Sequence, residues 1–265
     1  MKCAIFRTII LTAILTGATL VHPGQTGGMQ GQMFAGESLT YEGRVSKLKV
    51  SISVAELAFA AVAKPDSDEL VLKTLAVSKG TLLKMFRYSF LQQYESTIDL
   101  ANFRILKTTK HDVQKERIRD SEALFDYGEK RVRYVETDPT DRNRPPRRIA
   151  SEISEPLYDM VSSIYYVRTQ QLAVGKSFDL TVSDSGLVFK VPVVVTAREQ
   201  QKSTLGNLWC FRVEPQIFGT NRLIEQRGKM VIWMTDDARR IPVRAQINTS
   251  FGKIDIKLKS VTKQS

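Results

Sequence analysis

Apolar and polar residues alternate along much of this chain, most regularly near its C-terminal end. Residues 243–247 and 254–258 carry an apolar side chain at every second position, with Arg, Gln, Asp and Lys between them. A strand with one apolar and one polar side is typical of an antiparallel sheet that is solvated on one face. A similar alternation begins at residue 50 and recurs through the chain. The pattern predicts about ten strands.

Short turn motifs separate several of these apolar runs. SDSG at residues 183–186 lies between two of them, and DYG at residues 126–128 lies between two others. Small polar residues and glycine are typical of tight turns, because they adopt the backbone angles that such turns need. We therefore expect the flanking runs to pair as antiparallel hairpins.

Two segments break the period of two. Residues 80–90 carry apolar residues at helical spacing. Between the two segments, residues 138–152 are rich in Arg and Pro and indicate a basic loop. Residues 154–172 open with a capping residue and Pro156, followed by apolar residues on one helix face, namely Leu157, Met160, Val161, Ile164, Tyr165 and Val167.

Together these elements predict a mainly β, α+β fold. We expect a curved antiparallel sheet that forms an incomplete barrel, with one main helix packed on or in it. Residues 37–262 contain no linker-like stretch and are interpreted as a single β-rich domain. Residues 25–36 are rich in Gly and Gln and indicate a flexible leader.

The first 24 residues have the pattern of a signal peptide. Lys2 and Arg7 precede an apolar run over residues 9–21, which is shorter than the roughly 20 residues that span a bilayer. We expect an exported, periplasmic protein. The alternative is an uncleaved N-terminal anchor, which would be the route by which the protein associates with a membrane.

The chain is basic, with 39 Lys and Arg against 28 Asp and Glu, a net charge of +11. This excess favours solubility and anionic surfaces. Nucleic acid is not expected as a partner, because the protein is predicted to be exported and the arginines of residues 142–148 lack interleaved aromatic residues for base stacking.

Residues that carry enzyme chemistry are sparse. The two histidines are His22, which precedes the predicted domain, and His111, in a polar strand where we expect a solvated ring. Cys210 lies in the apolar stretch LWCFRV and predicts a buried core residue. Motifs of hydrolases, zinc sites and nucleotide-binding loops are missing from the sequence. We therefore expect no enzyme, no catalytic residue, no metal site and no cofactor.

The stretch WMTDDARRIPVR, residues 233–244, places two aspartates directly after an apolar run. Adjacent aspartates point apart, whereas the paired carboxylates of a glycosidase face each other across a cleft. We interpret Asp236 and Asp237 as turn residues that accept backbone N–H groups. Arg239 and Arg240 are expected to pair with them at the solvated edge, in contacts worth about 0–1 kcal/mol.

The order of several motifs resembles the bacterial family called domain of unknown function 3108. The motifs are GESLTYEGRV, YDMVSSIYYVRTQQLAVGKSFDL, GNLWCFRVEP and VIWMTDDARRIPVR followed by FGKIDIKL, and the likeness covers residues 36–261. The chain has Met160 after Asp159 where the family pattern has proline. The resemblance implies membership and no particular activity.

A weaker resemblance concerns the last strands alone. A strand, an Asp-containing turn, IPVR, a strand, FG and a final strand are similar to the C-terminal half of periplasmic lipoprotein carriers and related lipid-binding proteins. Those proteins wrap an incomplete barrel around a helix and hold acyl chains in its concave face. The match covers about thirty residues and is an analogy of fold.

Two functions follow as hypotheses. The first is a non-enzymatic exported protein that binds an apolar ligand, such as an acyl chain or a lipoprotein, in the concave face of its sheet. The second is an envelope structural or assembly protein that binds protein or glycan partners through loops and edges. Residues 82–90 would form either a lid over an apolar cavity or a plain core contact. The expected ligand contacts are Leu82, Leu83, Met85, Phe86, Phe90, Tyr165 and Trp233.

Overall fold

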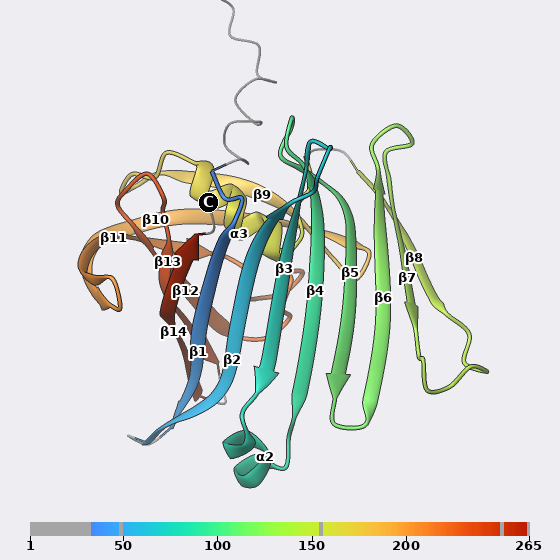
Figure 1. The fold of residues 1–265 in the computed structure, drawn as a ribbon, viewed down its shortest axis with the longest axis horizontal. Coiled ribbons are helices and arrows are strands. Elements are labelled where there is room, and N and C mark those ends of the chain that lie inside the picture. Colours follow the sequence, from blue (N-terminus) through green and yellow to red (C-terminus); the bar gives the residue numbers. More distant parts are fainter. Residues whose placement is uncertain (1–32, 48–49, 154–155, 250–251, 264–265) are drawn as a thin grey trace, which may run out of the picture.

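A single antiparallel sheet of 14 strands, with two helices, makes up the described part of the chain (Figure 1). The computed structural model describes residues 33–47, 50–153, 156–249 and 252–263. This architecture confirms the predicted mainly β fold. The predicted signal peptide and most of the leader lie outside the described residues, so both remain predictions.

The first half of the sheet is a meander of eight strands. Each strand pairs with the next one in the chain, and helix α2 (Gly80–Phe86) connects the third to the fourth. The strands are β1 (Glu37–Lys47), β2 (Val50–Ala63), β3 (Glu69–Ser78), β4 (Phe90–Asp99), β5 (Arg104–Gln114), β6 (Arg117–Asp126), β7 (Arg131–Thr137) and β8 (Arg147–Glu152).

Helix α3 (Met160–Thr169) leads into a second meander of six strands. The last strand of this meander pairs antiparallel with β1, which joins the two halves into one sheet with β8 and β9 at its ends. The strands are β9 (Ser177–Asp184), β10 (Leu187–Ser203), β11 (Gly206–Pro215), β12 (Gly228–Thr235), β13 (Pro242–Thr249) and β14 (Gly252–Lys263).

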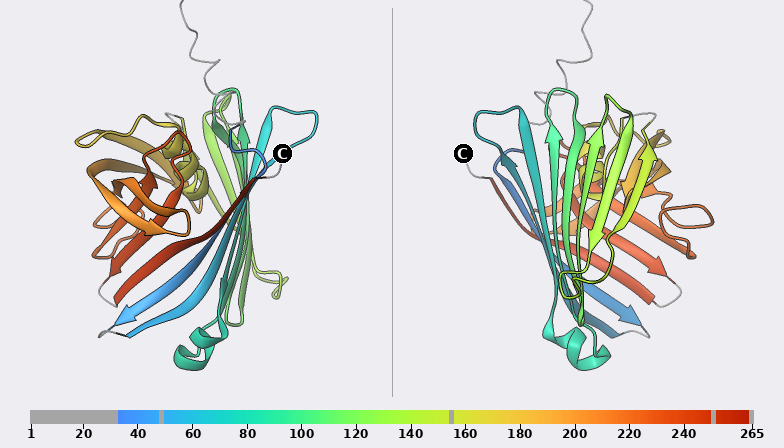
Figure 2. Two further views of the ribbon diagram at one scale, coloured as in Figure 1. Left: turned by 60° about the vertical axis from the view of Figure 1, so that its left-hand side comes forward. Right: turned by 90° about the vertical axis from the view of Figure 1, so that its right-hand side faces the viewer.

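The sheet is strongly curved and stays open (Figure 2). β-Bulges bend a strand and increase its twist, and several interrupt the ladders, at Thr40/Tyr41, Gly43/Arg44, Thr97/Ile98, Val195/Ala197 and Trp233/Met234. The end strands approach each other without forming a ladder, which matches the predicted incomplete barrel.

The turn between β9 and β10 makes the contact between the two ends of the sheet. Ser185 and Gly186 both have positive φ, 50° and 81°, as a two-residue type I′ hairpin turn requires. The Gly186 carbonyl accepts a hydrogen bond of 2.6 Å from the Ser151 hydroxyl of β8. The hairpin predicted from SDSG is therefore confirmed, and its turn lies against the opposite end of the sheet.

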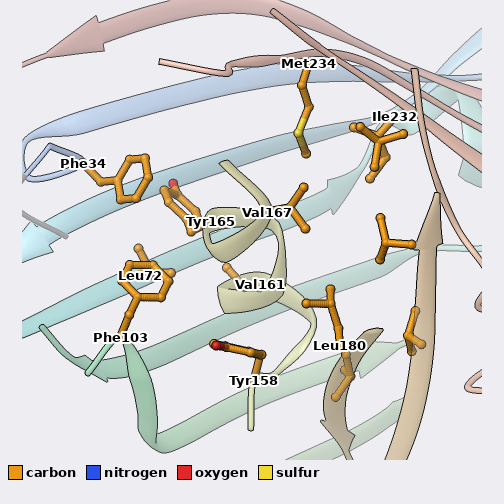
Figure 3. Packing of buried hydrophobic residues seen from close by; sticks show 14 of the residues in the cluster. Phe34, Leu72, Phe103, Tyr158, Val161, Tyr165, Val167, Leu180, Ile232 and Met234 are labelled. Atoms are coloured by element: carbon orange, nitrogen blue, oxygen red, sulfur yellow. The ribbon is translucent and has the colours of Figure 1, made fainter. Parts of the chain in front are cut away.

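Helix α3 lies on the concave side of the sheet, between its two halves (Figures 1 and 2). Its buried residues include Val161, Tyr165 and Val167, which pack against strands from both halves (Figure 3). The main helix therefore fills much of the space that the curved sheet encloses, as predicted for a helix packed in an incomplete barrel.

The helix begins later than the sequence pattern predicts. Asp159 is its N-cap, with a capping box to Ser162. Just before the cap, the Tyr158 N–H bonds to the Thr181 carbonyl of β9 at 3.0 Å, and the Ser183 N–H bonds to the Tyr158 carbonyl at 2.7 Å. The expected start near residue 154 is wrong, because Tyr158 pairs with β9 instead and the helix begins only after Asp159.

The sheet has four strands more than the ten expected. Some strands turn polar residues toward the concave side, such as Ser96, Thr108 and Asp112, which are buried, so their alternation is hard to detect. The interpretation of residues 138–152 as a loop is also wrong in part. Arg147–Glu152 forms β8, an end strand rich in charged residues, which is typical of a sheet edge.

Candidate functional site

A row of apolar side chains crosses the concave side of the sheet. Directly opposed residues of antiparallel strands lie on the same face, and the register aligns five such residues across β12, β13, β14, β1 and β2. Each is only half-buried, so the row forms an apolar surface at the margin of the core. The residues are Met230, Ile247, Ile254, Val45 and Ile52.

On one side of α3 the apolar surface deepens into a pocket of about 70 Å³, which we call the first apolar pocket. It lies between α3 and strands β9 to β12 and is almost wholly apolar. Its wall includes Met160, whose side chain is 45% exposed, so the pocket reaches the surface at the start of the helix. Its other principal lining residues are Ile164, Leu180, Val193, Met230 and Ile232.

The second apolar pocket, of about 90 Å³, lies on the other side of α3 against β1, β2 and β12 to β14. It shares Ile164, Met230 and Ile232 with the first pocket. These three side chains therefore separate two apolar spaces that flank one helix. The second pocket is also lined by Tyr41, Leu57, Phe59, Tyr165, Arg168 and Ile256.

A buried ion pair lies at the wall of the second apolar pocket. Arg168 and Glu37 form a two-pronged contact, with distances of 2.5 Å from Nη1 to Oε1 and 2.7 Å from Nη2 to Oε2. Nε and Nη2 of Arg168 also donate to the Arg239 carbonyl, each at 3.2 Å. The Arg168 guanidinium lies 4.5 Å from the centre of the Phe34 ring. Each charge is therefore compensated within the core.

Two tyrosines lie beside this ion pair. Tyr41 and Tyr165 are 6% and 2% exposed, and burial raises the pKa of both hydroxyls above their usual value. The positive charge of Arg168 lowers the pKa of both hydroxyls, and the negative charge of Glu37 raises it. Both phenols are therefore neutral hydrogen-bond donors at physiological pH.

The residues expected to contact a ligand do not all come together. Tyr165 lines the second apolar pocket. Trp233 lies on the opposite face of β12 from Ile232, where its Nε1 donates to Glu199 and Arg244 lies over its ring.

The other expected contacts lie in or beside α2, which connects β3 to β4 at the strand ends remote from α3 (Figure 1). Leu82 and Phe90 are half-buried there and line neither apolar pocket. Leu83, Met85 and Phe86 belong to α2, but their side chains lie outside the described part of the structure. Their role as a lid or as a core contact stays a prediction.

Several pocket residues were missed from the sequence. Ile232 and Met234 lie in the run KMVIWM, which is apolar on both faces, so alternation alone does not say which side meets the helix. Arg168 is a charged residue for which the sequence carries no signal of burial, because its partner Glu37 is 131 residues away. The apolar periodicity of residues 157–167 did point to Ile164 and Met160.

The turn at Asp236 and Asp237 is confirmed. Asp237 Oδ1 accepts the backbone N–H groups of Arg239 and Arg240, each at 3.1 Å, and Arg239 forms the expected ion pair with Asp237 at 2.9 Å. The expected pairing of the Arg240 side chain is wrong: among the described residues its guanidinium forms no ion pair with either aspartate, and Arg240 donates only its backbone N–H to Asp237. Asp236 pairs instead with Arg198 of β10 at 2.6 Å.

The convex face of the sheet, opposite to the apolar pockets, carries a polar hollow of about 570 Å³ over β4 to β7. His111 lies in it, and its Nδ1 is 2.6 Å from Asp120 Oδ1. The imidazole is 38% exposed, as predicted for a surface ring. Within the part of the chain that the structure describes, no hydroxyl or thiol bonds to this imidazole, so the hollow assembles no nucleophile with a base.

Cys210 is buried, as predicted. Burial raises the pKa of its thiol to about 11, which leaves little thiolate for nucleophilic chemistry at neutral pH. Among residues 33–47, 50–153, 156–249 and 252–263, no three His, Cys, Asp or Glu side chains are grouped to hold a metal ion. Neither helix in these ranges has the length and apolar character to cross a bilayer.

Comparison with known proteins gives a family match. The family model described as "Protein of unknown function (DUF3108)" matches residues 38–259, in agreement with the resemblance found in the sequence. None of the curated proteins compared with the chain matches it.

Solved structures show the likeness of fold. A β-barrel-like protein of domain of unknown function DUF1849 from Brucella abortus superposes with a TM-score of 0.56 at 8% identity, over 88% of this chain and 99% of that one. A Bacteroides fragilis protein with a YmcC-like fold gives a TM-score of 0.35 at 9% identity, over 86% and 96% of the two chains. The TM-score of 0.56 supports a likeness of fold alone, and the TM-score of 0.35 is too low to support even that.

Proposed function

This chain belongs to the DUF3108 family of proteins of unknown function, and we propose that it is an exported, non-enzymatic protein that holds an apolar chain on the concave side of its sheet. A lipid acyl chain has the chemistry and width that the site favours. The observation that carries the proposal is the pair of apolar pockets on the two sides of α3, which share Ile164, Met230 and Ile232.

The openness of the apolar surface supports this proposal. A sheet face that serves only as a core is covered by its partner element. Here α3 covers only part of the concave side, and the row that contains Met230, Ile247 and Ile254 stays half-exposed. Contiguous exposed apolar surface marks a binding site more often than a plain fold requirement.

The size of the pockets restricts the ligand. Volumes of about 70 and 90 Å³ are below the roughly 300–1,000 Å³ of an enclosed site for a drug-sized ligand. A cavity of about 150 Å³ accommodates a molecule as small as benzene. The ligand is therefore narrow. It lies beside α3 in a groove formed by the two apolar pockets and the open apolar row, with part of its length on that row.

Native mass spectrometry tests export and ligand together. Protein purified from the envelope fraction without detergent should have the mass of a chain that lacks about the first 24 residues, and it should carry bound lipid. Loss of lipid on mild activation would then release the apo mass. Lipid-free protein that also fails to bind an added acyl chain would contradict the proposal and favour the assembly-protein alternative.

A charge placed in the groove tests where the chain binds. Met230 is half-buried and lines both pockets, so Met230→Glu should weaken binding of a fluorescent fatty-chain probe tenfold or more. The reason is that the bound chain would desolvate the new carboxylate. Leu124→Glu is the matched control, because Leu124 is 43% exposed and lines neither pocket.

Equal loss of binding in both variants would show that the acyl chain does not bind at Met230. Melting temperatures of the two variants exclude unfolding as the cause of any loss.

A further inference from the structure

The Tyr165 hydroxyl is a buried polar group that forms no hydrogen bond with any residue in the described part of the chain. Its side chain is 2% exposed and lines the second apolar pocket. Within the described residues, its oxygen has no hydrogen-bond partner, whereas buried hydroxyls are bonded in the large majority of cases. Figure 3 shows the ring reaching from α3 toward Phe34, with the hydroxyl at its far end. A ligand atom that accepts a hydrogen bond would satisfy it.

The charges beside this hydroxyl select the kind of acceptor. Arg168 is fully engaged, since Glu37 and the Arg239 carbonyl bind all three of its nitrogens. A second carboxylate would meet the charge of Glu37 with no unpaired cation to compensate it, and a buried unpaired charge is strongly unfavourable. The surroundings therefore favour a neutral acceptor over an anionic one.

The protonation of Tyr165 agrees with a donor role. Burial raises the pKa of its hydroxyl, Arg168 lowers it, and Glu37 raises it. The phenol therefore keeps its proton at neutral pH and offers it to an acceptor. Most of the other residues that line the pocket are apolar, including Leu57, Phe59 and Ile256. The Arg244 guanidinium also lines it and is paired with Asp255, so the Tyr165 hydroxyl is the polar group that a neutral acceptor can satisfy.

We infer that the second apolar pocket binds an acyl chain through its ester or amide carbonyl, which accepts a hydrogen bond from Tyr165. The hydrocarbon would extend past Ile164 and Met230 onto the open apolar row. This inference rests on the proposed function and adds the chemical class of the ligand: an esterified or amide-linked acyl chain, as opposed to a free fatty acid.

Competition binding with matched probes tests the inference on the mature full chain. The probes are a methyl ester, a free acid and a methyl thioether with the same hydrocarbon chain, each displacing a fluorescent fatty-chain probe; the thioether sulfur is only a weak hydrogen-bond acceptor. The ester should bind three- to tenfold more tightly than the thioether, as expected for one hydrogen bond. It should bind tenfold or more tightly than the acid at neutral pH, because the acid is charged.

Removing one hydroxyl provides the decisive comparison. Tyr165→Phe should weaken ester binding three- to tenfold and leave thioether binding unchanged, so that the preference for the ester is lost. Tyr166→Phe is the matched control, since Tyr166 stacks on Tyr158 with ring centres 4.3 Å apart and lines neither apolar pocket. It should retain the preference for the ester.

The outcomes separate this inference from the proposed function. If none of the probes binds the native protein, the proposed function fails. If all bind with equal affinity and Tyr165→Phe changes nothing, the inference is overturned and apolar-chain binding stands. A monoacylglycerol and an N-acyl peptide distinguish an ester from an amide source, and preference of either one over the thioether supports the inference.

Discussion

Arg168 is held in the core with 1% of its side chain exposed, against 8% for Glu37. A buried ion pair contributes little net stability, because desolvation offsets the attraction, but removal of one partner leaves the other charge buried and unpaired. The pair connects the end of α3, the start of β1 and the turn before β13 through the Arg239 carbonyl. Its role is therefore to fix the position of these three elements.

We predict that Glu37→Leu and Arg168→Met each lower the free energy of unfolding by about 3–5 kcal/mol. The double variant should lose much less than the sum, because it removes both charges together. Urea unfolding of the four proteins measures this coupling. Additive losses would contradict a paired role.

An exposed ion pair provides the control for that cycle. Lys73 and Glu95 are 2.9 Å apart, with side chains 52% and 48% exposed. Lys73→Met should change the free energy of unfolding by about 1 kcal/mol or less, since solvent screens exposed pairs.

At the scale of elements, α3 depends on its N-terminal cap. Asp159 is fully buried and accepts the Ser162 N–H at 2.6 Å and the Ser96 hydroxyl. Ser96 belongs to β4, so the cap also attaches the helix to the sheet. Burial raises the pKa of the Asp159 carboxyl, and the hydrogen bonds from Ser96 and Ser162 act against this rise.

Substitution of Asp159 should separate the cap from the charge. We predict that Asp159→Ala lowers the free energy of unfolding by about 2–4 kcal/mol, from loss of the cap and from the unpaired Ser96 hydroxyl. Asp159→Asn should cost clearly less, because asparagine also caps helices. Thermal or urea unfolding at neutral pH measures both, and equal losses would contradict the capping role.

The pH dependence gives a second test of this prediction. A carboxyl whose pKa is raised by folding is disfavoured in its charged form, so the folded state loses stability as pH rises from the unfolded pKa through the folded one. The native protein should show this loss above about pH 4. Asp159→Asn should remove that component, and an unchanged pH profile would contradict it.

At the scale of the whole molecule, the open sheet is held at the turn between β9 and β10. Gly186 has a φ of 81°, and a Cβ there would lie 2.5 Å from Tyr134 Cβ and 3.0 Å from Ile149 Cβ. A side chain at this position would separate the two ends of the sheet. The width of the concave side therefore depends on a glycine that lies in sequence between Val182 and Val191, two residues that line the first apolar pocket.

We predict that Gly186→Ala lowers the free energy of unfolding by about 2–4 kcal/mol, through backbone strain and overpacking. Hydrogen exchange should accelerate in β8 and β9 more than in β1 and β14, which lie mid-sheet. Gly175→Ala is the control, because Gly175 has a φ of 86° with nothing within 4 Å of the added Cβ. It should cost about 1–2 kcal/mol, from backbone strain alone. Equal effects of the two variants would contradict a contact that holds the sheet.

Much of the fold could be predicted because its signals are local. The alternation in β13 and β14, the SDSG turn and the apolar face of α3 each depend on neighbouring residues only. The prediction failed where that signal was weak, as in β8, whose charged residues follow the habit of edge strands. It failed again at Tyr158, where a bridge to Val182 of β9 stands in place of the expected first turn of the helix.

By itself, the sequence determined the class of the fold, the turn at Asp237, the burial of Cys210 and the family. Each of these follows from residues that are close together in the chain, or from motifs in a fixed order. The tertiary structure alone decided that β1 pairs with β14, that Glu37 meets Arg168, and that Ile164 and Met230 line the same groove. These contacts join segments more than sixty residues apart, and no local period reports which distant faces share one interior.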